Sequence, residues 1–201
     1  MSERHPTPTK EDIALLPEFG RLGLNCIALV TTGEQAARAW DELVGSQQAP
    51  VWGFDTESKP TFQKNEMSQG PHIVQLATLH KAWVFQLHQP ECSAVVAGLL
   101  GHPGVVKAGF GLGDDKKRIT HKLGIEPQDV LDLNTSFRER GFRKDMGVKG
   151  AVAVLFNQRF IKSRKATTSN WANSRLTEAQ LVYAANDAYA AARVWHALNN
   201  L

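Results

Sequence analysis

The sequence contains only two cysteines and no long apolar run. Cys26 and Cys92 do not form a C-x-x-C pair, so neither a disulfide scaffold nor a zinc ribbon is indicated. No apolar stretch approaches the roughly 18 residues that would suggest a membrane-spanning helix. The first 20 residues mix charge with proline and lack the apolar core of a secretory signal. These absences favour a cytoplasmic protein with no membrane association.

A dinucleotide-binding loop is also missing, although Gly109, Gly111 and Gly113 follow an apolar run. The G-x-G-x-x-G pattern requires glycine at position 114, where the chain has Asp114. An anionic pyrophosphate would meet the carboxylates of Asp114 and Asp115 there, which is the wrong sign of charge. The segment therefore does not predict a dinucleotide site.

The length and composition are those of one ordinary globular domain. The chain has 201 residues, of which 42% are hydrophobic and 21% charged. Its net charge of +3 is unevenly distributed, because residues 138–175 contain ten Lys or Arg against two acidic residues. Composition alone leaves two interpretations of this basic region open: a solvated face, or a surface that binds a polyanion.

Predicted strands and helices alternate along the chain. We expect strands over 26–30, 49–56, 105–110 and 130–133, and a hairpin formed by 72–79 and 81–87. Helices are expected from a Thr32–Gln35 capping box to residue 43, over 92–100 and 113–123, and over 178–198 after a second capping box at Thr177–Gln180. This order predicts a mixed α/β sheet flanked by helices over residues 25–201. Residues 1–24 are expected to form an N-terminal extension that is either loosely ordered or docked.

Two carboxylates end the second predicted strand. Residues i and i+2 of a strand point to the same face, so Asp55 and Glu57 project together, roughly 6–7 Å apart along the backbone. The two charges repel each other unless a cation lies between them, and oxygen ligands suit Mg²⁺ or Mn²⁺. A D-x-E pattern alone is weak evidence because it occurs in many proteins by chance.

A tyrosine and an aspartate share a face of the last predicted helix. Tyr183 and Asp187 are four residues apart, and such residues are neighbours on a helix surface. Taken alone, the pair is better explained by a Tyr–Asp hydrogen bond that ties the helix to the core. Asp114 and Asp115 at a helix N-terminus could likewise offset the helix dipole, or one of them could point toward the end of the strand that carries Asp55.

Together, these motifs resemble the DEDDy branch of the DnaQ-like 3′–5′ exonucleases, in particular Werner-type exonuclease domains and, more distantly, ribonuclease D. The segments that carry the resemblance are FDTE, VQLAT, GFGLGDDKKRI, SNWANSRLTEAQ and YAANDAYAAARVW. The resemblance implies an RNase H-like mixed sheet of about five strands, one of them antiparallel. It also implies a metal-dependent nuclease that releases nucleoside 5′-monophosphates from 3′ ends.

The resemblance assigns the catalytic residues Asp55, Glu57, Asp115, Tyr183 and Asp187. In the family, the second motif is an Asp followed four residues later by an aliphatic side chain, and Asp115 has Ile119 at that distance. Asp114 would have Arg118 there, so we interpret Asp114 as a helix-capping residue. The sister branch has histidine five residues before the last Asp, where this chain has Val182, so the tyrosine branch matches better.

The family mechanism implies two divalent cations, Mg²⁺ or Mn²⁺, that clamp the scissile phosphate. By resemblance, Asp55 bridges both ions, Glu57 and Asp187 complete the nucleophile side, and Asp115 completes the leaving-group side. Tyr183 has an ordinary pKa of about 10 and is a poor general base, so we expect it to orient the attacking water.

The basic region becomes a candidate substrate surface under this interpretation. Arg159, Lys162, Arg164 and Lys165 are predicted to contact backbone phosphates, and Trp171 either stacks on a base or anchors its loop in the core. Two alternatives stay open: a ribonuclease D-like enzyme that trims RNA, and an inactive nucleic-acid-binding module on the same fold. Ribonuclease D proteins usually carry helical C-terminal domains, and their absence from this sequence favours the Werner-like interpretation without deciding between DNA and RNA. We expect DNA to be slightly favoured.

Overall fold

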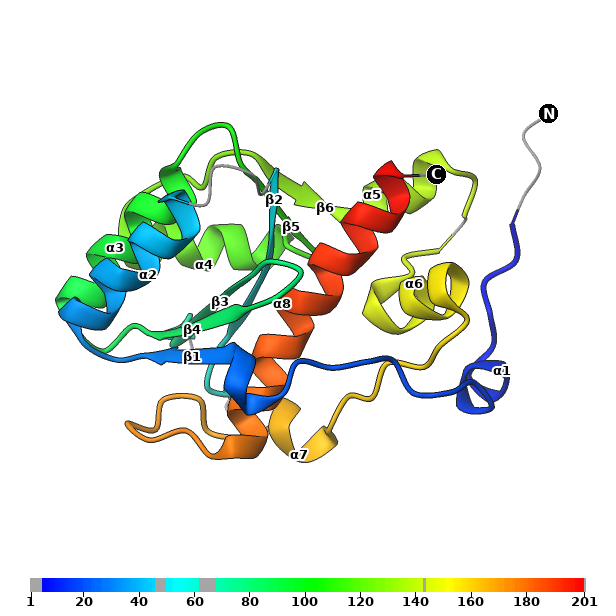
Figure 1. Ribbon diagram of the computed structural model, residues 1–201, viewed down its shortest axis with the longest axis horizontal. Coiled ribbons are helices and arrows are strands. Elements are labelled where there is room, and N and C mark those ends of the chain that lie inside the picture. The colour runs from blue at the N-terminus through cyan, green and yellow to red at the C-terminus, as the bar shows by residue number, and fades with distance from the viewer. Residues whose placement is uncertain (1–4, 46–49, 62–67, 143, 201) are drawn as a thin grey trace.

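A six-stranded mixed sheet lies at the centre of the protein (Figure 1). The computed structural model describes residues 5–45, 50–61, 68–142 and 144–200. The strands are β1 (Ile27–Val30), β2 (Val51–Glu57), β3 (Ile73–Ala77), β4 (Ala82–Gln86), β5 (Val106–Gly109) and β6 (Val130–Asp132). They lie in the order β1-β4-β3-β2-β5-β6, and β3 runs antiparallel to both of its neighbours while the other pairs are parallel. The predicted mixed sheet with one antiparallel strand is confirmed, with six strands where about five were expected.

Helices cover both faces of the sheet. They are α1 (Lys10–Ala14), α2 (Gly33–Gly45), α3 (Pro90–Gly101), α4 (Gly113–Leu123), α5 (Leu133–Glu139), α6 (Gly147–Phe156), α7 (Arg164–Thr167) and α8 (Glu178–Asn199), with a 3₁₀ turn at Leu24–Cys26. Helices α2 and α3 lie side by side at the left of Figure 1, and α8 crosses the sheet diagonally. No helix in the described ranges combines the length and apolar character needed to cross a bilayer.

Side chains on β2 alternate between two cores. Trp52 and Phe54 point into the core that α2, α3 and α4 cover, and both are fully buried. Val51 points to the opposite face, into the core that α8 covers. Because successive strand residues alternate between faces, Gly53, Asp55 and Glu57 also lie on the α8 side.

Helix α8 packs very closely on β2. Its Thr177 capping box is present as predicted, and its sheet-facing residues include the fully buried Ala184 and Ala188. A Cβ atom at Gly53 would lie only 1.8 Å from the carbonyl oxygen of Ala188. Glycine at this position therefore permits the helix backbone to approach the strand, and the approach brings Asp187 next to Asp55.

The described part of the N-terminal extension is docked on the domain. Phe19 is 3% exposed and packs against the rings of Phe156, Phe160 and Tyr189. The backbone N–H of Phe19 donates to the carbonyl of Arg159 at 3.0 Å. Of the two possibilities left open by the sequence, docking describes this segment.

Candidate active site

Three carboxylates meet where β2 passes under α8. Asp55 and Glu57 come from the end of β2, and Asp187 comes from the middle of α8. One oxygen of each carboxylate lies within 4.8 Å of the corresponding oxygens of the other two. The structure thus brings together residues that are 132 positions apart in the sequence, counted from Asp55 to Asp187.

Asp115 approaches the same place from the other side of β2. Gly111 has a φ of +68°, a conformation that glycine adopts without strain, and it turns the chain from β5 into α4. Asp115 then lies in the first turn of α4, where its Oδ1 accepts a hydrogen bond from the hydroxyl of Thr56. Asp115 lies outside the group of three carboxylates, but its charge contributes to the raised pKa of Asp55.

Asp114 does not cap α4, contrary to the expectation from sequence. The N-cap position is Leu112, and no side chain caps this end of the helix. Asp114 lies inside the first turn, too far along the chain to accept the capping hydrogen bonds. Its exposed carboxylate instead forms an ion pair with Lys117 at 3.4 Å.

Burial makes the three carboxylates unusually weak acids. Burial raises the pKa of Asp55 to about 8, and the charge of Asp187 adds to this effect. Burial also raises the pKa of Glu57 to about 9, with a contribution from Asp55, and it raises the pKa of Asp187. Like charges held out of water favour the protonated forms unless a cation neutralises them.

Lys162 supplies one positive charge to this cluster. Its Nζ lies 2.9 Å from Oδ2 of Asp187. Burial acts to lower the pKa of Lys162, but the charges of Asp187 and Asp55 outweigh burial and raise it. Apart from that ion pair, the buried oxygens of Asp187 accept no hydrogen bond of normal geometry within the described residues. One lysine cannot balance three carboxylates, so the donor set fits divalent metal ions.

Comparison with known families identifies the activity of this site. The model of a 3′–5′ exonuclease family matches residues 27–201. The chain belongs to this 3′–5′ exonuclease family. The match includes every strand of the sheet and all four predicted carboxylates, and it begins after the N-terminal extension.

Two curated relatives of this exonuclease are similar over three quarters of its length. The mouse bifunctional 3′–5′ exonuclease/ATP-dependent helicase WRN is 28% identical over 155 residues, which are 75% of this chain and 11% of the relative. An Arabidopsis thaliana 3′–5′ exonuclease is 26% identical over 151 residues, which are 74% of this chain and 52% of the relative. The chain thus spans about half, or much less, of the relatives that it matches.

Solved structures share the fold at lower sequence identity. The Aedes aegypti Nibbler EXO domain aligns with a TM-score of 0.72 and 20% identity over 90% of each chain. Trypanosoma brucei RNase D in complex with RNA U12 aligns with a TM-score of 0.73 and 20% identity, over 94% of this chain and 64% of the other. At this identity the likeness establishes the fold of the exonuclease.

The hydroxyl of Tyr183 lies beside the carboxylates of the exonuclease. Tyr183 is one helical turn before Asp187, and its hydroxyl is 3.1 Å from Oγ1 of Thr167. Burial raises the pKa of Tyr183, and the charge of Asp187 raises it further. The phenol therefore keeps its proton at neutral pH, as expected for a group that orients another molecule rather than acting as a base.

A cavity of about 440 Å³ opens beside the carboxylates. Asp55 and Asp187 form part of its wall, and Phe110 and Met146 add apolar surface. Lys149, near the start of α6, also lines the cavity, and sequence reasoning did not single it out. Lys149 belongs to the basic region, but no sequence pattern indicates that α6 turns this one lysine toward the site.

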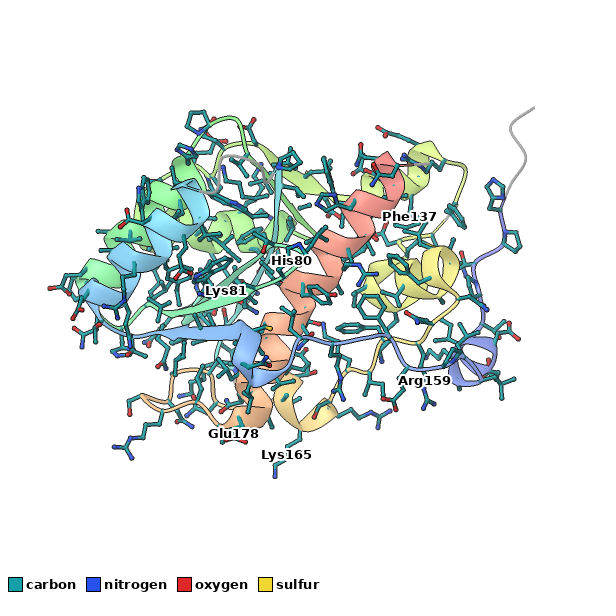
Figure 2. The ribbon with its side chains drawn as sticks, viewed as in Figure 1. His80, Lys81, Phe137, Arg159, Lys165 and Glu178 are labelled. Atoms are coloured by element: carbon teal, nitrogen blue, oxygen red, sulfur yellow. The ribbon has the colours of Figure 1, made fainter. Side chains whose placement is uncertain are left out.

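The structure separates the five predicted substrate-binding residues. Lys162 lies in the cavity, whereas Arg164 and Lys165 are exposed on α7, and Figure 2 shows Lys165 extending into solvent. Arg159 is instead engaged with the N-terminal extension, where its guanidinium donates to the Ala14 carbonyl at 3.1 Å.

Trp171 adopts the packing role that the sequence left open. Its side chain is 1% exposed, and its ring centroid lies 5.9 Å from that of Tyr183. A buried indole cannot stack on a base, so Trp171 supports the tyrosine instead.

Proposed function

We propose that this 3′–5′ exonuclease removes nucleotides one at a time from the 3′ ends of nucleic acid, with DNA favoured over RNA, and releases nucleoside 5′-monophosphates. The convergence of Asp55, Glu57 and Asp187 in a partly buried cluster, in which Asp187 is the buried member, carries the proposal, with Asp115 beside it. The preference for DNA rests on the motifs that resemble Werner-type exonuclease domains, in particular SNWANSRLTEAQ and YAANDAYAAARVW.

The four carboxylates would hold two divalent cations, Mg²⁺ or Mn²⁺. Asp55, Glu57 and Asp187 bring oxygens within 4.8 Å of one another, and Asp115 accepts a hydrogen bond from Thr56, the residue that follows Asp55. When bound, such ions supply an activated water molecule and neutralise the charge that develops on the departing oxygen.

The remaining polar groups of the cavity suit the substrate. Tyr183 keeps its proton and can orient the attacking water through one hydrogen bond, while Thr167 fixes the direction of the phenol. Lys149 and Lys162 offer ammonium groups to the phosphates. Phe110 and Met146 offer an apolar wall to the terminal sugar and base.

A degradation assay on matched oligonucleotides tests this function. Single- and double-stranded DNA and RNA of one sequence, labelled at the 5′ end, are incubated with Mg²⁺ or Mn²⁺. We expect a ladder that shortens from the 3′ end, mononucleotide products, and faster loss of DNA. The Asp187→Asn variant is the matched control, and a ladder of equal intensity from that variant would overturn the assignment.

Faster degradation of RNA in this assay would favour the second candidate, a ribonuclease D-like trimming enzyme. The observation that supports this candidate is the similarity in fold to Trypanosoma brucei RNase D in complex with RNA U12. The two candidates share the site and differ in the sugar that the cavity accepts.

The Tyr183→Phe variant measures the contribution of the phenol. Loss of one orienting hydrogen bond should slow the reaction by roughly tenfold, far less than loss of a carboxylate. Single-turnover rates with saturating Mg²⁺ give the comparison, and an unchanged rate would remove Tyr183 from the mechanism.

A further inference from the structure

Lys162 occupies the position of a counter-ion at the metal-binding carboxylates. Its Nζ lies 2.9 Å from Oδ2 of Asp187 and 5.4 Å from the centre of the Tyr183 ring. The Asp187 side chain is 3% exposed, whereas that of Lys162 is 31% exposed. Among the ion pairs of the described residues, this pair is the one that involves a carboxylate of the site.

The loop that carries Lys162 is fastened by an N-terminal strap, residues 14–19. The strap and the loop pair through their backbones, since Arg159 N–H donates to the Pro17 carbonyl at 2.8 Å and Phe19 N–H donates to the Arg159 carbonyl at 3.0 Å. The Arg159 guanidinium reaches back to the Ala14 carbonyl and to Glu18. Arg159 is three residues before Lys162, so the strap fixes the start of the segment that delivers the ammonium.

The strap lies outside the residues that the family model matches. The family match starts at residue 27, after the strap has ended. Phe19 nevertheless anchors the strap in the main core, where it is 3% exposed and contacts the ring of Phe160. The same core holds Phe160 at 5% exposure, two residues before Lys162.

An ammonium group and a divalent cation compete for the same carboxylate oxygens. A buried carboxylate needs a counter-charge, and Lys162 supplies it to Asp187. Two cations at one carboxylate repel each other, so a metal ion that binds Asp187 weakens the contact with Lys162 and favours its displacement. The flexible stem of lysine and the partial exposure of Lys162 provide a route for the ammonium to leave.

We propose that Lys162 is a positioning residue that holds the Asp187 carboxylate as its counter-ion until a divalent cation displaces it, and that the N-terminal strap keeps Lys162 in place. This inference rests on the proposed function, because it takes Asp187 as a metal ligand. The ion pair keeps Asp187 directed into the cavity and sets the metal concentration at which the site fills.

Metal titrations without nucleic acid test the proposal. The full chain and its Lys162→Met variant, both stripped of metal with chelator, are titrated with Mn²⁺, and binding is followed by calorimetry and by the unfolding temperature. Removal of the competing charge should lower the midpoint of the Mn²⁺ titration roughly tenfold, as expected for loss of one hydrogen bond to a charged group. The stripped variant should also unfold at a lower temperature than the stripped parent, because Asp187 loses its partner.

Two further variants control for charge. Lys162→Arg keeps the positive charge and should restore a midpoint close to that of the parent. Lys165→Met removes the same charge from an exposed position on α7 and should leave the midpoint unchanged. An equal or higher midpoint for Lys162→Met would overturn the proposal and would leave Lys162 as a phosphate contact only.

The strap is tested by Arg159→Gln, which removes the guanidinium contacts to Ala14 and Glu18 but keeps Lys162. Without these contacts the loop should hold Lys162 less firmly, and the free energy of its hydrogen bond to Asp187 should fall by roughly half. We therefore expect the midpoint of the Mn²⁺ titration to fall by about threefold. If Lys162→Met does not fold, Arg159→Gln still tests whether a firmly held Lys162 opposes metal binding. An unchanged midpoint for Arg159→Gln would overturn the role of the strap. If the parent chain binds no Mn²⁺, the proposed function fails; if parent and Lys162→Met bind it equally, only the role of Lys162 fails.

Discussion

Asp55 and Glu57 lie on a strand whose other side chains are mostly buried and apolar. Burial raises the pKa of Asp55 to about 8 and that of Glu57 to about 9, so the folded protein resists their ionisation. Side chains chosen only for stability would be neutral here. Keeping these two carboxyls on the strand costs the folded protein free energy. At the residue scale this cost indicates a function that requires negative charge.

The Asp55→Asn variant should separate activity from stability. It removes a carboxylate that would hold a cation, so we expect loss of at least roughly a thousandfold in rate, comparable to removing one essential catalytic group. It also removes a carboxyl whose ionisation the fold opposes, and the unfolding temperature should rise, by about 2–4 °C for each kcal/mol gained at this chain length. Nuclease assays and thermal unfolding in chelator measure the two effects, and a large fall in the unfolding temperature would contradict the argument.

The stability of the protein should depend on pH in a direction set by these carboxyls. In the unfolded chain their pKa values are about 4, and in the folded protein they are raised to about 8 and about 9. Between about pH 4 and pH 9 the folded state therefore binds more protons than the unfolded state. In chelator, the free energy of unfolding should fall as the pH rises through this range.

A divalent cation should offset that loss. Mg²⁺ should raise the unfolding temperature more at pH 8 than at pH 5.5, because more protons must leave the site at the lower pH. Thermal unfolding at the two pH values, with and without Mg²⁺, gives the comparison. A larger effect at pH 5.5 would show that the carboxyls are not the metal ligands.

At the scale of elements, the site depends on how closely α8 lies on β2. The two elements meet at Gly53 and Ala188, and Ala188 directly follows Asp187. Asp55 is two residues after Gly53 on the same face of the strand. Any change that lifts the helix from the strand at this contact must also move Asp187 away from Asp55.

Gly53→Ala should therefore damage both stability and activity. Its methyl group would lie 1.8 Å from the Ala188 carbonyl oxygen, and overpacking of this kind costs about 1–3 kcal/mol or more. Gly101→Ala is the matched control, because a Cβ there meets no atom within 4 Å and we expect almost no change. Denaturant unfolding and Mn²⁺ titration test the pair, and normal metal binding by Gly53→Ala would refute the link between packing and the site.

Local rules predicted the elements and the residues that they place on one face. Strand spacing placed Asp55 beside Glu57, helix spacing placed Tyr183 beside Asp187, and the Thr177 capping box marked the start of α8. Each of these rules concerns residues within a few positions of one another.

Contacts between distant segments were not predictable in the same way. The ion pair of Lys162 with Asp187 depends on the path of a loop without regular structure, and no sequence pattern fixes that path. The docking of Phe19 and the engagement of Arg159 depend on where the N-terminal segment meets the same loop. The sequence allowed Trp171 to be either exposed or buried. Its packing against Tyr183, which no local pattern encodes, determines that it is buried.

The charge of the whole molecule is arranged for a polyanionic substrate. Residues 1–137 contain 12 basic and 16 acidic side chains, whereas residues 138–175 contain ten basic and two acidic ones. The second region contributes Lys149 and Lys162 to the cavity and exposes Arg164 and Lys165 on α7. Basic side chains are thus present both in the cavity and on the exposed surface of α7, as binding of a polyanion requires.

Removal of one exposed charge should change the salt dependence of binding. If Lys165 contacts a phosphate, the Lys165→Ala variant should bind single-stranded DNA with a slope of log K against log salt that is smaller by about 0.7. Binding is measured in Ca²⁺, with Lys10→Ala in the N-terminal segment as a control of equal charge. An unchanged slope would count against a phosphate contact at Lys165.

The order of the segments along the chain has a consequence for biosynthesis. Asp55 and Glu57 are translated early, Asp115 follows with α4, and Asp187 arrives only with α8, after every strand of the sheet. A ribosome therefore displays a nascent chain whose acidic cluster lacks its last member until the final helix emerges and docks. The nascent domain therefore acquires its full set of carboxylates only when α8 docks on β2.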